Sequence, residues 1–461
     1  FGSSNVVRDL LGAPGRNNGL IYYISIIALA IIVLLKNVNR DDLSFLKKIL
    51  FSTSLVLGAY CTLQFLNLDP VTWNNPYNRV IGTLGNPNFS SAALATFSVY
   101  WLYNSLSESK AKAKYWKIFT FIYFAFLAWS TQALQGLVIV FIGVLLVGYV
   151  YLREKFDSKL LPTFSVVFGG LGLFLMSISF IGLGPFGGAL EQYTLKLRSV
   201  YASIGIQGML NSPVFGVGID NYNSAFRLFR TPEFVNQYDI GLNADNAHST
   251  PAQIGATFGV IVFALYLALH LLVLVKSLRI VNSRDKSIGL EKGIAVVWLL
   301  IFAQSLLSIE LIGLGVLNWL LGAVILSMNY NRPEVSSSEQ KSGSKKKSIQ
   351  NLPAWTGSAT IGLLVVSLIP TVYIAREDGA YKNIFALSMQ NPSDKDWVKL
   401  QYSKLSSLTL DEPSKVGRLL ENMYNSEMYE EIKSTIFNVY QKNPKDVFAN
   451  ELMATYYRNN N

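Results

Sequence analysis

The chain of 461 residues is 51% hydrophobic and only 15% charged, and its formal net charge is +10. Soluble proteins of this length carry more charge, so the composition excludes a soluble globular protein over most of the chain. The basic residues stand in short clusters between apolar runs, which is typical of membrane proteins and argues against nucleic-acid binding. The single cysteine, Cys61, excludes an intramolecular disulfide and a cysteine-based metal site.

Hydropathy predicts about ten membrane-spanning helices, because each apolar run approaches the roughly 20 residues that cross a bilayer. The predicted spans cover residues 19–35, 45–66, 89–106, 116–130, 134–152, 160–183, 251–275, 293–310, 312–328 and 354–374. The fourth and fifth spans are nearly continuous, and so are the eighth and ninth. We therefore expect an all-α, polytopic transmembrane bundle over residues 1–330.

Clusters of lysine and arginine follow the first, third, fifth, seventh and ninth spans. Every second connection is thus basic, as the positive-inside rule requires of cytoplasmic loops. This topology puts residues 1–18, 67–88, 184–250 and everything after residue 374 on the outer face. It also implies an odd number of earlier helices, if the native N-terminus is cytoplasmic.

The polar C-terminal part has its own organisation. A Ser/Lys-rich stretch at residues 331–351 predicts a cytoplasmic linker, and the final span lies within residues 352–375. Short amphipathic helices then end at Asn391-Pro392 and at Asn443-Pro444. These junctions favour a small tetratricopeptide-like (TPR-like) helical domain over residues 376–461, which is a suitable surface for a protein partner.

The outer loops hold six arginines that the topology does not need: Arg8, Arg16, Arg79, Arg198, Arg227 and Arg230. The planar guanidinium fork suits phosphate oxygens, so several arginines beside a membrane can bind a lipid-linked phosphate. The best candidates are Arg198, which precedes a predicted amphipathic helix, and Arg79, which precedes a glycine-rich turn. Arg8, Arg227 and Arg230 fit solvated loop residues better.

Residues 243–250 include His248, one of only two histidines, at the end of a polar loop and just before an apolar run. A histidine at a membrane surface suggests proton transfer. The alternative is that His248 only caps the helix that begins near Thr250. The other histidine, His270, lies at mid-membrane, where we expect it to face a neighbouring helix.

Three further positions have local structural interpretations. The motif at residues 85–88 predicts a turn before a helix, with Asn88 as its N-cap. The residues from Pro213 to Gly218 predict a turn that ends a re-entrant or interfacial helix. Glu310 ends the eighth predicted span, where it can pair with one of the outer arginines.

Several of these stretches resemble the O-antigen ligase and Wzy polymerase superfamily of bacterial membrane glycosyltransferases. The matching stretches are residues 8–19, 79–88, 198–222 and 246–259. The most specific part is the large outer loop, with an arginine early and Asn-Ala-His late. Two local differences from the family stand at Thr131-Gln132, where members often have Ser-Arg, and directly after His248, where the usual aromatic or acidic residue is absent.

The resemblance covers roughly residues 1–328 and implies a membrane fold of the GT-C type. It implies transfer of a glycan from an undecaprenyl-diphosphate carrier to a hydroxyl of a lipid, another glycan or a protein, with neither metal nor nucleotide cofactor. The expected location is the bacterial cytoplasmic (inner) membrane, among its lipids, with the active site and the C-terminal domain on the outer face.

The residues fit this chemistry, because arginine can stabilise the diphosphate leaving group and a neutral histidine can take the acceptor proton. We assign His248 as the catalytic base and Arg198 as the main diphosphate ligand. The further substrate-binding candidates are Arg79, Arg16, Asn246 and Asn86.

Other functions stay open. Within the superfamily the chain is alternatively a polysaccharide polymerase or a protein O-oligosaccharyltransferase. A secondary transporter or flippase predicts intramembrane charge, inverted repeats and helices broken at mid-membrane, whereas this chain has almost no charge inside its spans. A receptor or scaffold that acts through the C-terminal domain is a third possibility.

Overall fold

The computed structural model describes residues 6–12, 16, 18–36, 38–71, 75, 77–156, 160, 193–219, 221–238, 242–328, 429–442 and 447–460, and isolated positions between 372 and 400. Every regular element in these ranges is helical, which confirms the predicted all-α class. The chain divides into two compact units, Phe1–Ile21 with Asn331–Asn461, and Tyr22–Tyr330. The predicted spans at 160–183 and 354–374 and the basic linker lie outside the described residues.

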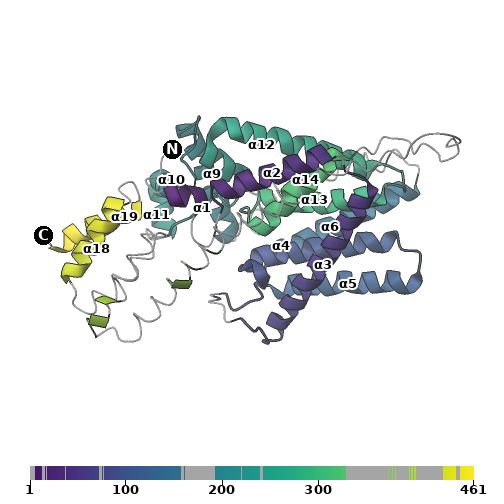
Figure 1. Ribbon diagram of the computed structural model, residues 1–461, viewed down its shortest axis with the longest axis horizontal. Coiled ribbons are helices and arrows are strands. Elements are labelled where there is room, and N and C mark those ends of the chain that lie inside the picture. The colour runs from purple at the N-terminus through teal and green to yellow at the C-terminus, as the bar shows by residue number, and fades with distance from the viewer. Residues whose placement is uncertain are drawn as a thin grey trace, which may run out of the picture. The chain divides into compact units, whose positions relative to one another are not determined.

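The larger unit is a helical bundle (Figure 1). Its helices are α2 (Leu20–Lys36), α3 (Arg40–Phe65), η1 (Gly82–Leu84), α4 (Pro87–Leu106), α5 (Ala111–Ser130), α6 (Leu134–Lys155), α9 (Tyr193–Asn211), α10 (Tyr222–Phe229), α11 (Pro232–Tyr238), α12 (Thr250–Asn282), α13 (Gly289–Leu306) and α14 (Ile312–Ser327). By length and composition α3, α6, α12 and α13 are able to cross a membrane, and α2 and α14 are apolar but shorter. These helices support a multi-pass membrane protein.

Helix α4 forms the centre of this bundle and packs against α5, α6, α13 and α3. Almost all of its residues are buried, and many are small, which lets neighbouring backbones approach closely. On α6 a Cβ added at Gly136 would collide with Ser91, and one at Gly143 would collide with Val99. The buried Ser98 hydroxyl donates to Phe121 O at 3.0 Å, so this polar side chain is satisfied within the bundle.

Two helices begin at other residues than predicted, because capping residues fix their first turns. Helix α3 begins at Arg40, five residues before the predicted span, because Asn39 and Asp42 form a capping box. The N-cap of α4 is Asn86 rather than the predicted Asn88: the Asn86 side chain accepts from Asn88 N–H at 2.9 Å. Pro87 follows as the first helical residue, a position where its missing N–H costs nothing.

The connection between α13 and α14 is longer than predicted. Helix α13 ends at Leu306 and α14 begins at Ile312, so five residues separate spans that hydropathy made nearly continuous. Glu310 therefore lies in the connection and does not end a helix, contrary to the prediction.

The seventh predicted span is a broken helix. Gly259 interrupts α12 with φ of 83° and ψ of −177°, a conformation that favours glycine. The turn after α9 supplies a missing backbone partner, since Val260 N–H donates to Pro213 O at 2.7 Å. Residues 260–282 alone reach the roughly 20 residues that cross a bilayer, so the break differs from the mid-membrane breaks of transporters.

The same turn also bonds to the outer part of α12. Val217 and Gly218 donate their N–H groups to the carbonyls of Ala256 and Thr257, at 2.7 and 3.2 Å. Gly216 has φ of 67°, and a Cβ there would collide with Ala256 O. The predicted turn thus ends α9, as expected, and also completes the hydrogen bonding of a helix distant in sequence.

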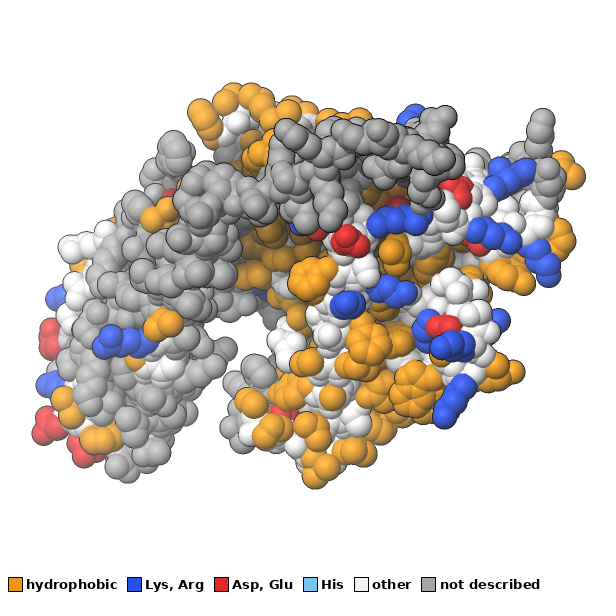
Figure 2. Space-filling view, turned by 45° about the vertical axis from the view of Figure 1, so that its right-hand side comes forward, with side chains coloured by type: hydrophobic (Ala, Val, Ile, Leu, Met, Phe, Trp, Pro, Cys, Tyr) orange, Lys and Arg blue, Asp and Glu red, His pale blue; other side chains and the backbone are white. Residues whose placement is uncertain are grey.

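The basic connections of the larger unit meet at one end. Arg40, after the first span, donates to Ser287 O at 2.7 Å, and Arg153, after the fifth, donates to Asn282 O at 3.2 Å. Both acceptors belong to the basic region after the seventh span. Figure 2 shows Lys and Arg side chains gathered towards one side of the bundle, beside a largely hydrophobic surface. This arrangement supports the predicted alternation of loops, and their orientation in the membrane stays a prediction.

The smaller unit contributes α1 (Val6–Leu11), α18 (Tyr429–Lys442) and α19 (Val447–Asn460). Helices α18 and α19 pack together, with Phe437 against the rings of Tyr456 and Tyr457 at 6.0 and 6.3 Å. Helix α18 ends directly before the predicted Asn-Pro junction. A helical pair is therefore present, and its TPR-like character stays a prediction.

Candidate functional site

Helix α9 and the residues before α12 form a compact group at the outer end predicted for the bundle. Helix α9 packs along α12 and against α10. The rings of Tyr201, Tyr222 and Phe226 form its apolar core together with Ala247, and the Tyr222 hydroxyl donates to Tyr201 O at 2.5 Å. The polar loop that carries His248 is therefore fixed against α9.

The backbone at His248 adopts a left-handed conformation with φ of 48°. Asn246 stabilises this turn, because its Oδ1 accepts from His248 N–H at 2.9 Å. The N-cap of α12 is Ser249, and His248 precedes it. A capping role for His248, the structural alternative, is therefore wrong.

The amide of Asn246 is engaged on both sides. Its Oδ1 holds the His248 backbone, and its Nδ2 donates to Asp245 Oδ1. The Asn246 side chain is also buried. This geometry makes Asn246 a residue that positions His248.

Tyr201 contacts His248 and lies on the same helix as Arg198. Its ring lies 5.0 Å from the His248 ring, centroid to centroid, at an angle of 31°. Arg198 lies one turn before Tyr201 on α9, so the two side chains share a face of the helix. The structure thus brings Arg198 and His248 to the same part of the molecule.

Arg198 lies inside α9 and not before a helix, contrary to the prediction. Its Nη1 donates to Leu307 O at 3.2 Å, and no carboxylate of the described residues forms an ion pair with it. Burial lowers the pKa of the guanidinium from its ordinary value, because burial penalises the charged form. A partly desolvated cation with a neutral partner is well suited to bind an anion.

The α13–α14 connection contacts the segments that carry Arg198 and His248. Leu307 O accepts from Arg198, and Ser308 O accepts at 3.1 Å from the hydroxyl of Thr250, two residues after His248. Directly after the connection, a Cβ at Gly313 in the first turn of α14 would lie 3.4 Å from Leu84 of η1. The connection therefore lies beside both outer loops that carry predicted site residues, and sequence reasoning missed this role.

Arg79 and Asn86 lie in the loop before α4. Arg79 is exposed, and its Nη1 donates to Gln132 O at 3.4 Å. Its guanidinium thus reaches the α5–α6 connection. The Asn86 Nδ2 donates to the Tyr77 hydroxyl at 3.2 Å, so both ends of this amide have local partners. Arg16 belongs to the smaller unit.

Comparison with known proteins finds a similarity in the central part of this chain. Residues 118–267 match a family model described as O-antigen ligase. This confirms the resemblance to the O-antigen ligase superfamily. No curated protein matches the chain. The O-antigen ligase segment supports glycosyl transfer at a membrane in general terms, and it contains Arg198, Asn246 and His248.

Glu310 lies outside the O-antigen ligase segment, in the α13–α14 connection. Its Oε1 accepts from Trp319 Nε1 at 3.0 Å, and no described arginine forms an ion pair with it, so the predicted pairing is wrong. Burial raises the pKa of the Glu310 carboxyl from 4.5 to about 7, although the hydrogen bond from Trp319 acts in the opposite direction. A buried carboxyl that titrates near neutrality is a feature that the sequence pattern did not indicate.

The remaining polar candidates have structural roles. Arg230 is partly buried and donates to Leu242 O at 3.0 Å, and Arg227 lies on α10 and is also partly buried. The expectation of solvated loop residues is therefore wrong for both. The second histidine, His270, is buried within α12 and bonds to Tyr266 O and to Asn318 at 3.0 and 3.3 Å, which confirms that it faces neighbouring helices.

Within the described ranges, no group of three His, Cys, Asp or Glu side chains is arranged to hold a metal ion.

Proposed function

We propose that the chain transfers a glycan from an undecaprenyl-diphosphate carrier to an acceptor hydroxyl at the outer face of the bacterial cytoplasmic membrane. One observation carries the proposal: within the segment that matches the O-antigen ligase model, Arg198 bonds to Leu307 O and Thr250, two residues after His248, bonds to Ser308 O, so both candidates adjoin the same α13–α14 connection. A cation for the diphosphate and a base for the hydroxyl are the two groups that this transfer requires.

In the proposed step the acceptor oxygen attacks the anomeric carbon of the glycan, and its proton passes to an imidazole nitrogen of His248. The bond between the anomeric carbon and the phosphate oxygen breaks, and its electron pair leaves with the diphosphate. The fixed guanidinium of Arg198 offsets the charge that develops on the leaving oxygen. The products are undecaprenyl diphosphate and a glycan linked to the acceptor.

The other candidates take supporting roles in this proposal. Asn246 holds the left-handed turn that aims His248. Arg79 acts as an auxiliary ligand of the carrier phosphates, and Asn86 orders the loop that carries Arg79 through its bonds to Asn88 and Tyr77.

The test uses the purified chain in proteoliposomes, a fluorescent undecaprenyl-diphosphate oligosaccharide and a bacterial envelope fraction as acceptor. We expect the labelled donor to decrease while label appears on the acceptor in equal amount. Extension of the labelled glycan itself would instead identify a polymerase. Movement of intact donor across sealed vesicles without cleavage would refute the proposal in favour of a flippase.

A further inference from the structure

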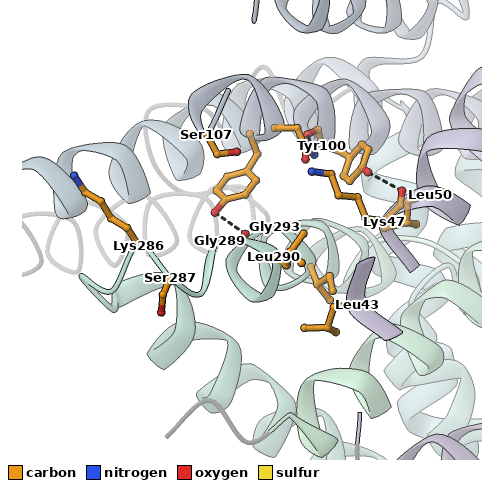
Figure 3. Close-up of a pocket in the computed structure, with 13 residues that line it drawn as sticks. Leu43, Lys47, Leu50, Tyr100, Ser107, Lys286, Ser287, Gly289, Leu290 and Gly293 are labelled. Atoms are coloured by element: carbon orange, nitrogen blue, oxygen red, sulfur yellow. Dashed lines mark hydrogen bonds between the residues drawn. The ribbon is translucent and has the colours of Figure 1, made fainter. Parts of the chain in front are cut away.

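A cavity of about 220 Å³ lies at the basic end of the larger unit, among α3, α4 and α13 (Figure 3). This volume corresponds to roughly seven waters at about 30 Å³ each, which is smaller than a drug-sized site and suits one polar headgroup. One part of its lining is apolar and another is polar. The apolar part includes Leu43, Leu50 and Ile294, and the polar part includes Lys47, Tyr103 and Asn104.

Lys47 is a cation without a partner in this cavity. Figure 3 shows its side chain reaching from α3 into the space beside α4, and the residue is only partly exposed. None of the ion pairs or hydrogen bonds of the described residues engages its ammonium group. A cation that loses water without gaining a partner is unfavourable, so the site is incomplete without an anion.

The charges around Lys47 leave this imbalance in place. Lys117 and Glu108 are the charged side chains near enough to act on it. Glu108 is bonded to Lys117 at 2.7 Å and acts on Lys47 without a bond to it. A second lysine, Lys286, also lines the cavity. On the side of Tyr103, Glu291 and Glu154 are near, and Glu154 is bonded to Lys292. Lys47 therefore stays without a bonded carboxylate.

The polar groups of the wall are held in place. Tyr103 donates its hydroxyl to Gly289 O at 2.9 Å, and Asn104 Nδ2 donates to Tyr100 O at 2.7 Å. Beside them, the N-cap of α13 is Ile288, which makes no side-chain cap, and the first turn of this helix carries the buried Glu291. Lys47 is therefore the group of the cavity that attracts an anion.

We propose that this cavity binds the phosphate of an anionic phospholipid headgroup. A lipid is favoured over a soluble phosphate because α3 presents exposed Phe45 and Ile49 beside Lys47, as a lipid-facing helix does. Basic pockets between spanning helices on the cytoplasmic side are typical headgroup sites, and this end holds the loops with cytoplasmic character. The lipid would tie α3, α4 and α13 together.

The test compares unfolding temperatures in nanodiscs of phosphatidylcholine with those in nanodiscs that also contain phosphatidylglycerol. We expect phosphatidylglycerol to raise the unfolding temperature of the wild type. Lys47→Gln should lose this rise and bind the lipid about five-fold more weakly, the effect of one surface lysine. Lys47→Arg keeps the charge and should retain it.

Lys48→Gln is the matched control, because Lys48 is the next residue on α3 and is exposed outside the cavity. It should behave as the wild type. Lys47→Gln should be at least as stable as the wild type in phosphatidylcholine, since it removes an unpaired cation. An unchanged rise in Lys47→Gln would overturn the site. An equal rise from glycerol 3-phosphate added to delipidated protein would overturn the lipid as its ligand.

Discussion

Replacement of His248 by asparagine separates catalysis from backbone structure at one position. The φ of 48° at this residue is a conformation that costs most residues about 1–2 kcal/mol, but asparagine adopts it several times more often than they do. The bond to Asn246 Oδ1 uses the backbone N–H of residue 248, so it persists in the variant. His248→Asn should therefore keep the turn and lose only the imidazole.

The two consequences of losing the imidazole differ in size. The ring contact with Tyr201 at 5.0 Å contributes about 0.5–1.5 kcal/mol, so the variant should unfold at a slightly lower temperature. One positioned base contributes about 10²–10⁴-fold to a rate, which corresponds to about 3–5 kcal/mol of activation free energy. The loss of transfer should thus far exceed any loss of stability.

The assay measures donor binding, transfer rate and unfolding temperature of the wild type, His248→Asn and His248→Ala in proteoliposomes. Both variants should bind the donor and fail to transfer the glycan. His248→Ala should also be less stable, because alanine tolerates positive φ less well than asparagine does. A well-folded His248→Asn enzyme that transfers at the wild-type rate would refute the assignment of the base.

Four further outcomes are expected. Arg198→Lys should keep weak donor binding and lose most transfer, and Arg198→Ala should lose both. Replacement of the exposed Arg279 by alanine should leave activity unchanged. Normal transfer by Arg198→Ala would show that another residue binds the diphosphate. Gly259→Ala should lower the free energy of unfolding by about 2 kcal/mol or more, because its Cβ would lie 2.5 Å from Pro213 O. Gly148→Ala should be neutral or stabilising in a thermal scan, because its Cβ meets no atom within 4 Å. The free energy of unfolding of the wild type should fall by about 3 kcal/mol as pH rises from 4.5 to about 7, because the unfolded chain releases the Glu310 proton before the folded chain does. A Glu310→Gln variant whose free energy of unfolding falls equally over this pH range would contradict this. An impermeant thiol reagent on intact spheroplasts should label cysteine at Asn243 and not at Ser109, with buried Cys61 left in place, and the reverse pattern would invert the topology.

Hydropathy located most helices because bilayer thickness sets the length of an apolar run, but it did not locate their ends. Helix α3 starts early through its capping box, a local signal that hydropathy does not register. The α13–α14 connection is a different case. Its carbonyls accept hydrogen bonds from Arg198 and Thr250, which are distant in sequence. Hydropathy does not show where α13 ends, because the connection is as apolar as the helices and its contacts are tertiary.

The candidate site, too, was predicted from the sequence only in part. The sequence indicated His248 because the chain has only two histidines, and it indicated Arg198 because an arginine in an outer loop opposes the positive-inside bias. It did not indicate Tyr201, whose aromatic ring looks like any core residue until the fold sets it against His248. Nor did it indicate the break at Gly259, since the bonds that replace those of the helix come from the turn after α9.

The interruption of α12 also has a mechanical consequence. The outer fragment before Gly259 is bonded to the turn after α9, so it moves with the helix that carries Arg198, and His248 lies just before its N-cap. Beyond the bond from Val260 N–H to Pro213 O, residues 261–282 form the part of the helix that can change its tilt with the thickness of the bilayer. A single glycine between the two can take up such a tilt as a local hinge rotation. Changes in membrane thickness would then leave the spacing between the cation and the imidazole undisturbed.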